Sequence, residues 1–176
     1  MGKGHDVTGR STLGRRGRDR RVNGPPQDAP WVWMTREMLE SPAWVILSGH
    51  ARKVIDRVML EHMAHGGAEN GRLPVTYDDL VAYGVRRNSI APAIAETVAL
   101  GFLDHERGRA AGGSARGHVQ LFRLTWLRTA DNEPATNRWK SIDSREAARS
   151  LAEATRRAGV DGRRRARLQP VPTGKI

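Results

Sequence analysis

Between residues 73 and 126 the spacing of apolar positions changes several times, and this stretch is the most informative part of the chain. Residues 73–75 form a short extended segment, and two helical patterns follow, at about 76–83 and about 88–100. Apolar residues at 102–103 and 119–124 then indicate two strands, separated by the Gly-rich segment RGRAAGGSARG. The pattern predicts a mainly α protein with one small β-hairpin, an α+β fold.

The segment before this stretch predicts a longer helix over about 49–65. Its apolar residues recur at helical spacing, Ser48 is a suitable N-cap, and Gly66 and Gly67 end the pattern. Two short helical turns precede it, with Thr35 and Ser41 as caps. The apolar stripe of the longer helix comprises Ala51, Val54, Ile55, Val58, Leu60 and Met63.

Within residues 76–100 the sequence predicts two helices joined by a tight turn. Thr76 caps the first helix, and Gly84 permits a left-handed exit from it. In the second helix, Ile90, Ile94 and Val98 are spaced by four and are expected on the inward face. Pro92 fits only a first helical turn, so this helix is predicted to begin near Asn88 or Ser89.

After residue 126 the apolar pattern weakens. Trp139 can dock back on the body, and Asp143 with Glu146 is a candidate capping box for a last helix with a narrow, Ala-rich apolar face. The predicted organisation is a disordered basic arm (1–30), a folded domain (31–130), a linker (131–142), a C-terminal helix (143–158) and a basic disordered tail (159–176).

The charge lies mainly outside the central part of the chain. The net charge is +11, of which residues 1–33 contribute +4, residues 34–130 contribute +2 and residues 131–176 contribute +5. Cationic segments bind polyanions by releasing counterions, without sequence preference. Nucleic acid is therefore the expected partner, and a merely solvated charged tail is the alternative. An anionic membrane is disfavoured, because neither arm alternates large apolar with basic residues.

Several classes of site are excluded or disfavoured by composition. The chain has no cysteine, which excludes disulfides, cysteine-based zinc sites and thiol nucleophiles. The order Glu61-His62-x-x-His65 differs from that of zinc proteases, and no P-loop or nucleophile elbow is present. We expect a non-enzymatic protein without metal or cofactor. No apolar run has membrane-spanning or signal-peptide length, so we expect a cytoplasmic, nucleoid-associated location.

A helix-turn-helix protein inserts the N-terminal end of its second helix into the major groove, and here that end holds Arg86, Arg87, Asn88 and Ser89. Arginine can pair with guanine or a phosphate, and asparagine with adenine. With its apolar residues turned inward, the second helix is expected to present Ser89, Pro92, Ala93 and Glu96 outward. Ala93 could then meet a thymine methyl group. Backbone contacts are expected from Tyr77, Arg86, Arg87 and the hairpin residues Arg107, Arg109 and Arg116.

Residues 33–127 resemble the winged helix-turn-helix proteins of bacterial mobile elements and phages, including the N-terminal domain of the replication-protein-O-like family. The matching segments are SPAWVILSGHARKVID, NGRLPVTYDDLVAYGVRRNSIAPAIAETVALGFLD and LFRLTW. The resemblance implies DNA contact by residues 86–89 and Ala93, and a wing formed by residues 107–117. It covers somewhat over half of the chain, which is shorter than replication initiators, and says nothing about the two arms.

Three functions are consistent with these features. The first is a sequence-specific regulator of transcription that binds double-stranded DNA, such as a regulator of a mobile element. The second is a replication-initiation or helicase-loading factor whose C-terminal segment recruits a protein. The third is a protein-interaction adaptor that uses the same face. A homodimer stays open, with residues 143–158 as a weak candidate interface, since no strong heptad pattern exists.

Overall fold

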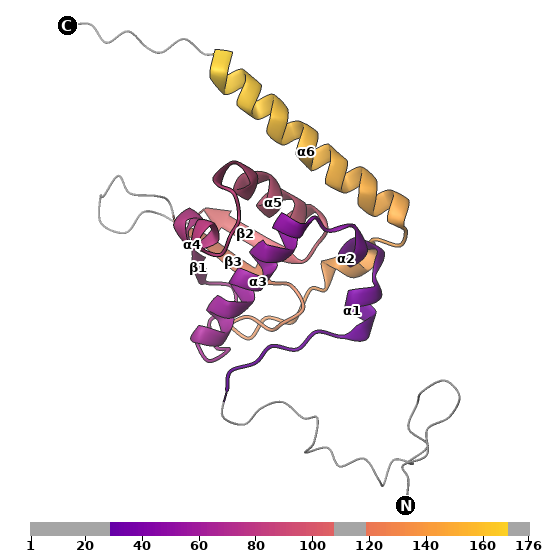
Figure 1. Cartoon of the computed structure of the whole chain (residues 1–176). Coiled ribbons are helices and arrows are strands. Elements are labelled where there is room, and N and C mark those ends of the chain that lie inside the picture. Colours follow the sequence, from indigo (N-terminus) through magenta and orange to yellow (C-terminus); the bar gives the residue numbers. More distant parts are fainter. Residues whose placement is uncertain (1–28, 108–118, 169–176) are drawn as a thin grey trace, which may run out of the picture. The chain divides into compact units, whose positions relative to one another are not determined.

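The computed structural model describes residues 29–107 and 119–168, and the helices and strands of these ranges lie in the unit that begins at Val32. The fold combines α-helices with one small antiparallel sheet, as the sequence predicts (Figure 1). The helices are α1 (Arg36–Glu40), α2 (Pro42–Ile46), α3 (Gly49–Ala64), α4 (Tyr77–Ala82), α5 (Arg87–Ala99), the 3-10 helix η1 (Arg138–Ser141) and α6 (Arg145–Leu168). The strands are β1 (Leu73–Val75), β2 (Leu103–Arg107) and β3 (Gln120–Leu124).

The predicted N-caps of the first three helices are confirmed. The side chain of Thr35 accepts from Met38 N, that of Ser41 from Trp44 N and that of Ser48 from Ala51 N. Each bond satisfies one N–H that a helix start leaves without an intrahelical partner. Helix α3 then buries four apolar residues of the predicted stripe, whereas Leu60 is exposed; the buried four are Ala51, Val54, Ile55 and Val58.

The sheet has the strand order β1-β3-β2, with both pairs antiparallel. Phe122 in the central strand lies opposite Leu73 on one side and His105 on the other. Residues 120, 122 and 124 of β3 are buried, whereas residues 121 and 123 are half-buried. Because side chains alternate along a strand, one face of the sheet packs on the helices. Helices α3 and α5 supply contacts on that face.

Residues 131–142, predicted to be a linker, contribute to the core. Trp139 is buried and stacks on Phe102, with ring centroids 6.3 Å apart, and Phe102 meets Trp44 edge-on at 5.3 Å. Gly101 makes this docking possible: its φ is +78°, and a Cβ there would lie 2.6 Å from the backbone nitrogen of Trp139. Only glycine fits both conditions.

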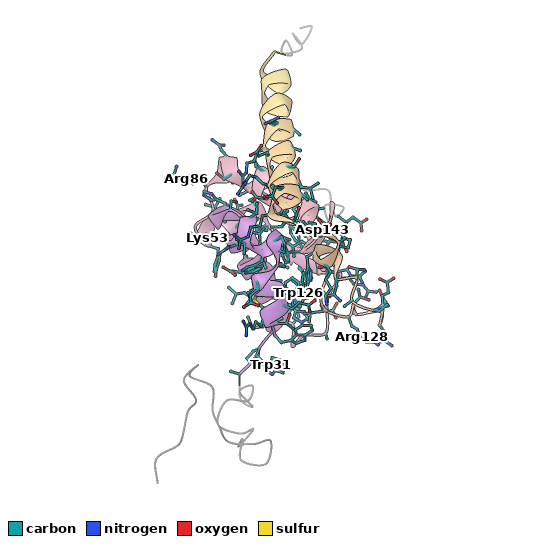
Figure 2. All side chains as sticks on the ribbon, turned by 90° about the vertical axis from the view of Figure 1, so that its right-hand side faces the viewer. Trp31, Lys53, Arg86, Trp126, Arg128 and Asp143 are labelled. Atoms are coloured by element: carbon teal, nitrogen blue, oxygen red, sulfur yellow. The ribbon has the colours of Figure 1, made fainter. Side chains whose placement is uncertain are left out.

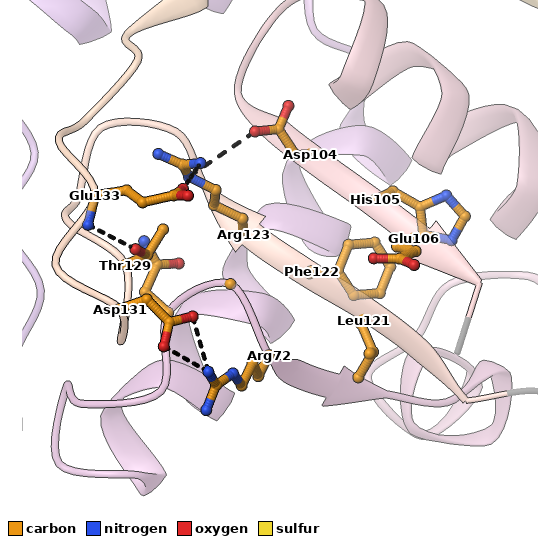
Figure 3. A pocket seen from close by; sticks show the side chains of 12 residues that line it. Arg72, Asp104, His105, Glu106, Leu121, Phe122, Arg123, Thr129, Asp131 and Glu133 are labelled. Atoms are coloured by element: carbon orange, nitrogen blue, oxygen red, sulfur yellow. Dashed lines mark hydrogen bonds and ion pairs between the residues drawn. The ribbon is translucent and has the colours of Figure 1, made fainter. Parts of the chain in front are cut away.

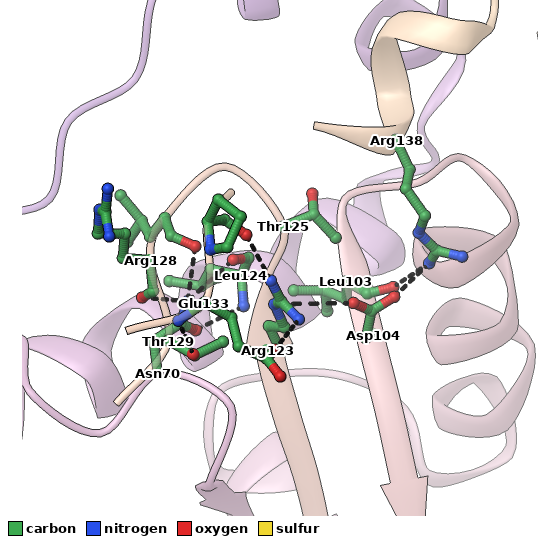
Figure 4. Close-up of polar contacts among 12 residues, drawn as sticks. Asn70, Leu103, Asp104, Arg123, Leu124, Thr125, Arg128, Thr129, Glu133 and Arg138 are labelled. Atoms are coloured by element: carbon green, nitrogen blue, oxygen red, sulfur yellow. Dashed lines mark hydrogen bonds and ion pairs between the residues drawn. The ribbon is translucent and has the colours of Figure 1, made fainter. Parts of the chain in front are cut away.

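A second long-range contact, made by Asn70, joins the turn before β1 to the segment after β3. The Asn70 amide is fully buried; its nitrogen donates to the carbonyls of Leu124, Leu127 and Arg128 at 3.0, 3.2 and 2.9 Å. Its oxygen accepts from Leu124 N at 2.8 Å (Figure 4). In the sequence, the dipeptide Asn70-Gly71 is a signal for a turn and for nothing more. The turn is present, with Gly71 at φ +100°, but the burial of the amide depends on a segment more than fifty residues away.

The last helix differs from the prediction in both its cap and its length. The side chain of Ser144 accepts from Ala147 N at 3.1 Å, so the capping box proposed for Asp143 and Glu146 is wrong. The helix continues to Leu168 instead of ending near 158. The added turns (159–168) hold four arginines, which are good helix formers, although two glycines lie among them. Ala148 and Ala152 are buried as expected, whereas Leu151 is exposed.

Candidate nucleic-acid interface

Helix α4 has a well-defined start. Thr76 Oγ accepts from Asp79 N, and the Asp79 carboxylate accepts in return from the N–H and the hydroxyl of Thr76, at 2.8 and 2.7 Å. Partial burial acts to raise the pKa of Asp79, but the bonds from Thr76 and the neighbouring Arg57 outweigh it and lower the pKa. This reciprocal cap fixes the direction of the helix that precedes the predicted DNA-contacting end.

The turn between α4 and α5 is tight. Gly84 adopts φ +85°, as the left-handed exit predicted from sequence requires, and its carbonyl accepts from Lys53 Nζ at 3.1 Å. Val85 follows and is buried, with its N–H bonded to the Leu80 carbonyl at 2.9 Å. A buried valine after the glycine anchors the turn, so the next residues are forced outward.

The N-terminal end of α5, residues 86–89, is accessible. Arg86, Arg87 and Asn88 are exposed and Ser89 is half-buried. Figure 2 shows Arg86 pointing away from the body of the protein. Among the described residues Arg86 has no acidic partner, whereas Arg87 pairs with Asp78 at 2.6 Å. Both members of that pair are largely exposed, so it contributes little stability and can exchange for another anion.

Helix α5 begins at Arg87, not at Asn88 or Ser89, which puts Pro92 in the second turn. A proline there has no N–H to donate to the preceding turn, so the helix tolerates the loss of one bond. The prediction that Pro92 must lie in a first turn is therefore wrong.

The outward face of α5 is not the predicted one. Ala93 and Glu96 are each 2% exposed, so Ala93 cannot contact a thymine methyl group as predicted, and Glu96 does not face outward. A spacing of four residues drifts around an α-helix, and the stripe that reaches the core follows the spacing of three and four instead. The buried residues are Ile90, Ala93, Ile94, Glu96 and Thr97, and the exposed ones are Arg87, Asn88, Ala91 and Ala95.

Glu96 has a structural partner set. Its carboxylate accepts from Ser48 N at 2.8 Å, from Ser48 Oγ at 3.0 Å and from Arg156 of α6 at 3.3 Å. The carboxylate therefore lies at the start of α3, where the helix dipole favours an anion. The prediction that Glu96 faces outward is therefore wrong, and no sequence pattern indicates its contact with Ser48 across 48 residues.

Helix α6 lies along part of the outward face of α5. A cavity of about 410 Å³ lies between the two helices, lined by Arg87, Asn88, Ala91, Pro92, Ala95, Thr155 and Ala158. The groove is mostly apolar because alanine and proline side chains form most of its walls. The first residues of α5 border it without being covered, whereas the middle of α5 faces α6.

The remaining predicted contact residues have different positions. Tyr77 is half-buried and packs on the core at the first position of α4. The backbone of Arg107 ends β2 opposite Gln120. Arg109, Arg116 and the rest of the predicted wing, 108–118, lie outside the described residues, as do the arm 1–28 and residues 169–176 of the tail.

A larger cavity, about 600 Å³, lies beside the sheet, at the edge formed with residues 129–133 (Figure 3). Its charged lining residues pair with one another: Arg72 with Asp131, and Arg123 with Glu133 at 2.9 Å. Its remaining acids are Asp104 and Glu106, so carboxylates outnumber guanidinium groups. This excess of carboxylates disfavours the binding of phosphate, in contrast to the cationic N-terminal end of α5.

The two histidines at the C-terminal end of α3 lie in different environments. His62 is buried, and burial lowers its pKa, whereas His65 is exposed and bonds to Glu61 at 3.1 Å. Within the described ranges, no cluster of three or more His, Asp or Glu could hold a metal ion. No helix of those ranges is long and apolar enough to cross a membrane.

Comparison of the chain with protein-family models, with curated proteins and with solved structures gave no match.

Proposed function

We propose that residues 49–124 form a winged helix-turn-helix that binds double-stranded DNA, with the first residues of α5 in the major groove. The order α3-β1-α4-α5-β2-β3 and the strand order β1-β3-β2 support the proposal. The observation that carries it is the accessible cationic start of α5, where Arg86 has no acidic partner among the described residues. Such an end can enter a groove without first breaking a buried contact.

The side chains available for base contact are few. Arg86 and Arg87 can reach guanine or phosphate, and Asn88 can pair with adenine. Ala91, not Ala93, is the small exposed residue one turn further along and takes over the proposed contact with a thymine methyl group. We infer that backbone contacts supply much of the affinity and that direct base reading involves one or two base pairs.

The proposed role is that of a transcriptional regulator, with a replication-initiation factor as the alternative role for the same DNA-binding surface. Mapping of bound sites across the genome separates the two. Peaks at promoters support regulation, whereas a single peak at an origin supports replication.

A protein-interaction adaptor is the competing function, and the composition of α5 favours it to a degree. Ala91 and Ala95, which remain exposed beside the groove shared with α6, offer no long donors, and Val81 and Tyr83 of the preceding helix and turn are also exposed. Such a surface suits protein contact. Binding through phosphates weakens steeply with salt, by about 0.9 in log–log slope per phosphate contact, whereas apolar contact does not.

The direct test replaces Arg86 and Arg87 by alanine in the full chain. The control variant Arg36→Ala/Arg72→Ala removes the same charge from exposed residues elsewhere. Binding is measured by fluorescence anisotropy on duplexes selected from a random-sequence library. We expect a loss of about 1–3 kcal/mol per base-reading contact, roughly 5- to 150-fold, with the control close to wild type. Equal affinity of the two variants, or a wild-type chain that selects no duplex, would overturn the proposal.

A further inference from the structure

Helix α6 carries five arginines at helical spacing. Arg145, Arg149, Arg156, Arg163 and Arg167 are separated by 4, 7, 7 and 4 residues. At 100° per residue these positions fall within about 40° of one another on the helix, and at 1.5 Å per residue they span about 33 Å. That length is close to one turn of B-DNA, roughly 34–36 Å.

Helix α6 runs roughly antiparallel to α5 (Figure 1). Arg156 of α6 meets Glu96, and Thr155 and Ala158 line the groove along α5 from Arg87 to Ala95. The ten residues after Ala158 add about 15 Å of helix. In both Figure 1 and Figure 2 the last turns of α6 extend past the body.

The charge of the stripe is available where the structure describes it. Arg145 and Arg149 are exposed and have no ion-pair partner among the described residues. Arg156 shares its charge with Glu96 and thereby fixes the stripe against α5. The acid nearest to the stripe, Glu153, pairs with Arg157 at 3.5 Å, on the neighbouring face. A purely solvated tail would not be expected to form a contact like that of Arg156 with the buried Glu96 carboxylate.

We propose that the arginine stripe of α6 binds the phosphate backbone of the same duplex whose groove receives the start of α5. The proposal rests on the proposed DNA binding and specifies a second, sequence-independent surface for it. The stripe belongs to a helix that packs against α5. Arginines in a row along a straight helix match a linear polyanion, and phosphate contacts of this kind position a protein without reading sequence.

The same helix provides a matched control. The stripe variant is Arg149→Ala/Arg163→Ala/Arg167→Ala. The control variant is Arg157→Ala/Arg164→Ala/Arg165→Ala, which removes equal charge from the same helix at positions about 80–180° from the centre of the stripe. Alanine preserves helix propensity in both, and circular dichroism checks that both remain equally helical.

Both variants are measured in the full chain on a random-sequence duplex over a range of salt concentrations. The stripe variant should lower the log–log salt slope by about 2–3, at about 0.9 per lost phosphate contact, and weaken binding roughly 10-fold or more. The control variant should change the slope by less than about 1, the equivalent of one phosphate contact.

The possible outcomes separate this inference from the proposed function. Equal effects of the two triple variants, or an unchanged slope in the stripe variant, would overturn the stripe as a binding surface while leaving α5 untouched. Loss of binding in the stripe variant together with full binding by Arg86→Ala/Arg87→Ala would support the stripe and overturn the role of α5. A wild-type chain that binds vesicles of anionic phospholipid more tightly than duplex would overturn the assignment to DNA.

Discussion

Two regions of this protein are rich in arginine, and their neighbours differ. Around the sheet, Arg72, Arg123 and Arg138 each pair with a carboxylate (Figures 3 and 4). At the start of α5 and along α6, Arg86, Arg145 and Arg149 have no such partner among the described residues. Residue type is the same in both regions, so the neighbouring acids decide which arginines hold the fold together and which can bind an external anion.

The largest expected effect on stability comes from Asn70, whose buried amide bonds to the segment after β3. Asn70→Ala removes the partner of a buried N–H and of three carbonyls, which should lower the free energy of unfolding by about 2–3 kcal/mol. Urea denaturation measures the change. The control Asp131→Ala breaks only an exposed pair and should cost less than about 1 kcal/mol. If Asn70→Ala and Asp131→Ala were equally stable, the buried Asn70 amide would not stabilise the fold. The contrast between the two regions would then fail.

The second prediction compares one arginine from each region. The Arg123 side chain is 16% exposed and donates to Glu133 and to the Pro134 carbonyl, so Arg123→Ala should cost about 1–2 kcal/mol of stability. Arg86→Ala should stay within about 0.5 kcal/mol of wild type, because it breaks no described contact. Duplex binding should show the reverse order. The same ranking in both assays would remove the distinction between the regions.

The third prediction concerns the boundary between scaffold and exposed edge. Arg156→Ala leaves the buried Glu96 carboxylate with Ser48 as its described hydrogen-bond partner and should cost about 1 kcal/mol, since Arg156 is itself 49% exposed. Its neighbour Arg157 pairs only with an exposed glutamate, so Arg157→Ala should be close to neutral. Thermal unfolding of both variants tests whether α6 is fixed to α5 by this contact.

The smallest expected effect is a pH dependence of stability. It arises from a buried residue of the fold and not from the proposed binding surfaces. Burial lowers the pKa of His62 below 6.5, so the unfolded chain binds more protons than the folded chain just below that pH. The stability contributed by neutral His62 is complete above 6.5 and is lost as the pH falls towards the folded pKa. Urea titrations at about pH 7.5 and about pH 5.5 should show this loss, and His62→Gln should reduce it. An unchanged pH dependence in that variant would place the titrating group elsewhere.

Local signals in the sequence predicted the elements well where one residue is enough to specify them. The caps Thr35, Ser41, Ser48 and Thr76 and the left-handed Gly84 are all found as expected. Each acts through a bond or a dihedral angle within its own turn, so no distant contact is needed to specify it.

The candidate interface was predicted less completely, because it depends on the rotation of α5 about its axis. Arg86, Arg87 and Asn88 are exposed, but Ala93 and Glu96 face inward. Three residues spaced by four fit two neighbouring rotations of a helix almost equally well. Packing against α3 and the sheet selects one of them, and that choice is not visible in α5 alone.

The order of the elements, their caps and the separation of a nearly neutral middle from cationic ends can all be read from the amino-acid sequence. The packing of Trp139 on Phe102, the bonds of Glu96 to Ser48 at the start of α3 and the packing of α6 on α5 emerge only in the folded chain. The difference lies in the range of the contacts. Caps and turns close over three or four residues, whereas the pairing of an arginine or the burial of a carboxylate depends on side chains from segments far apart in the chain.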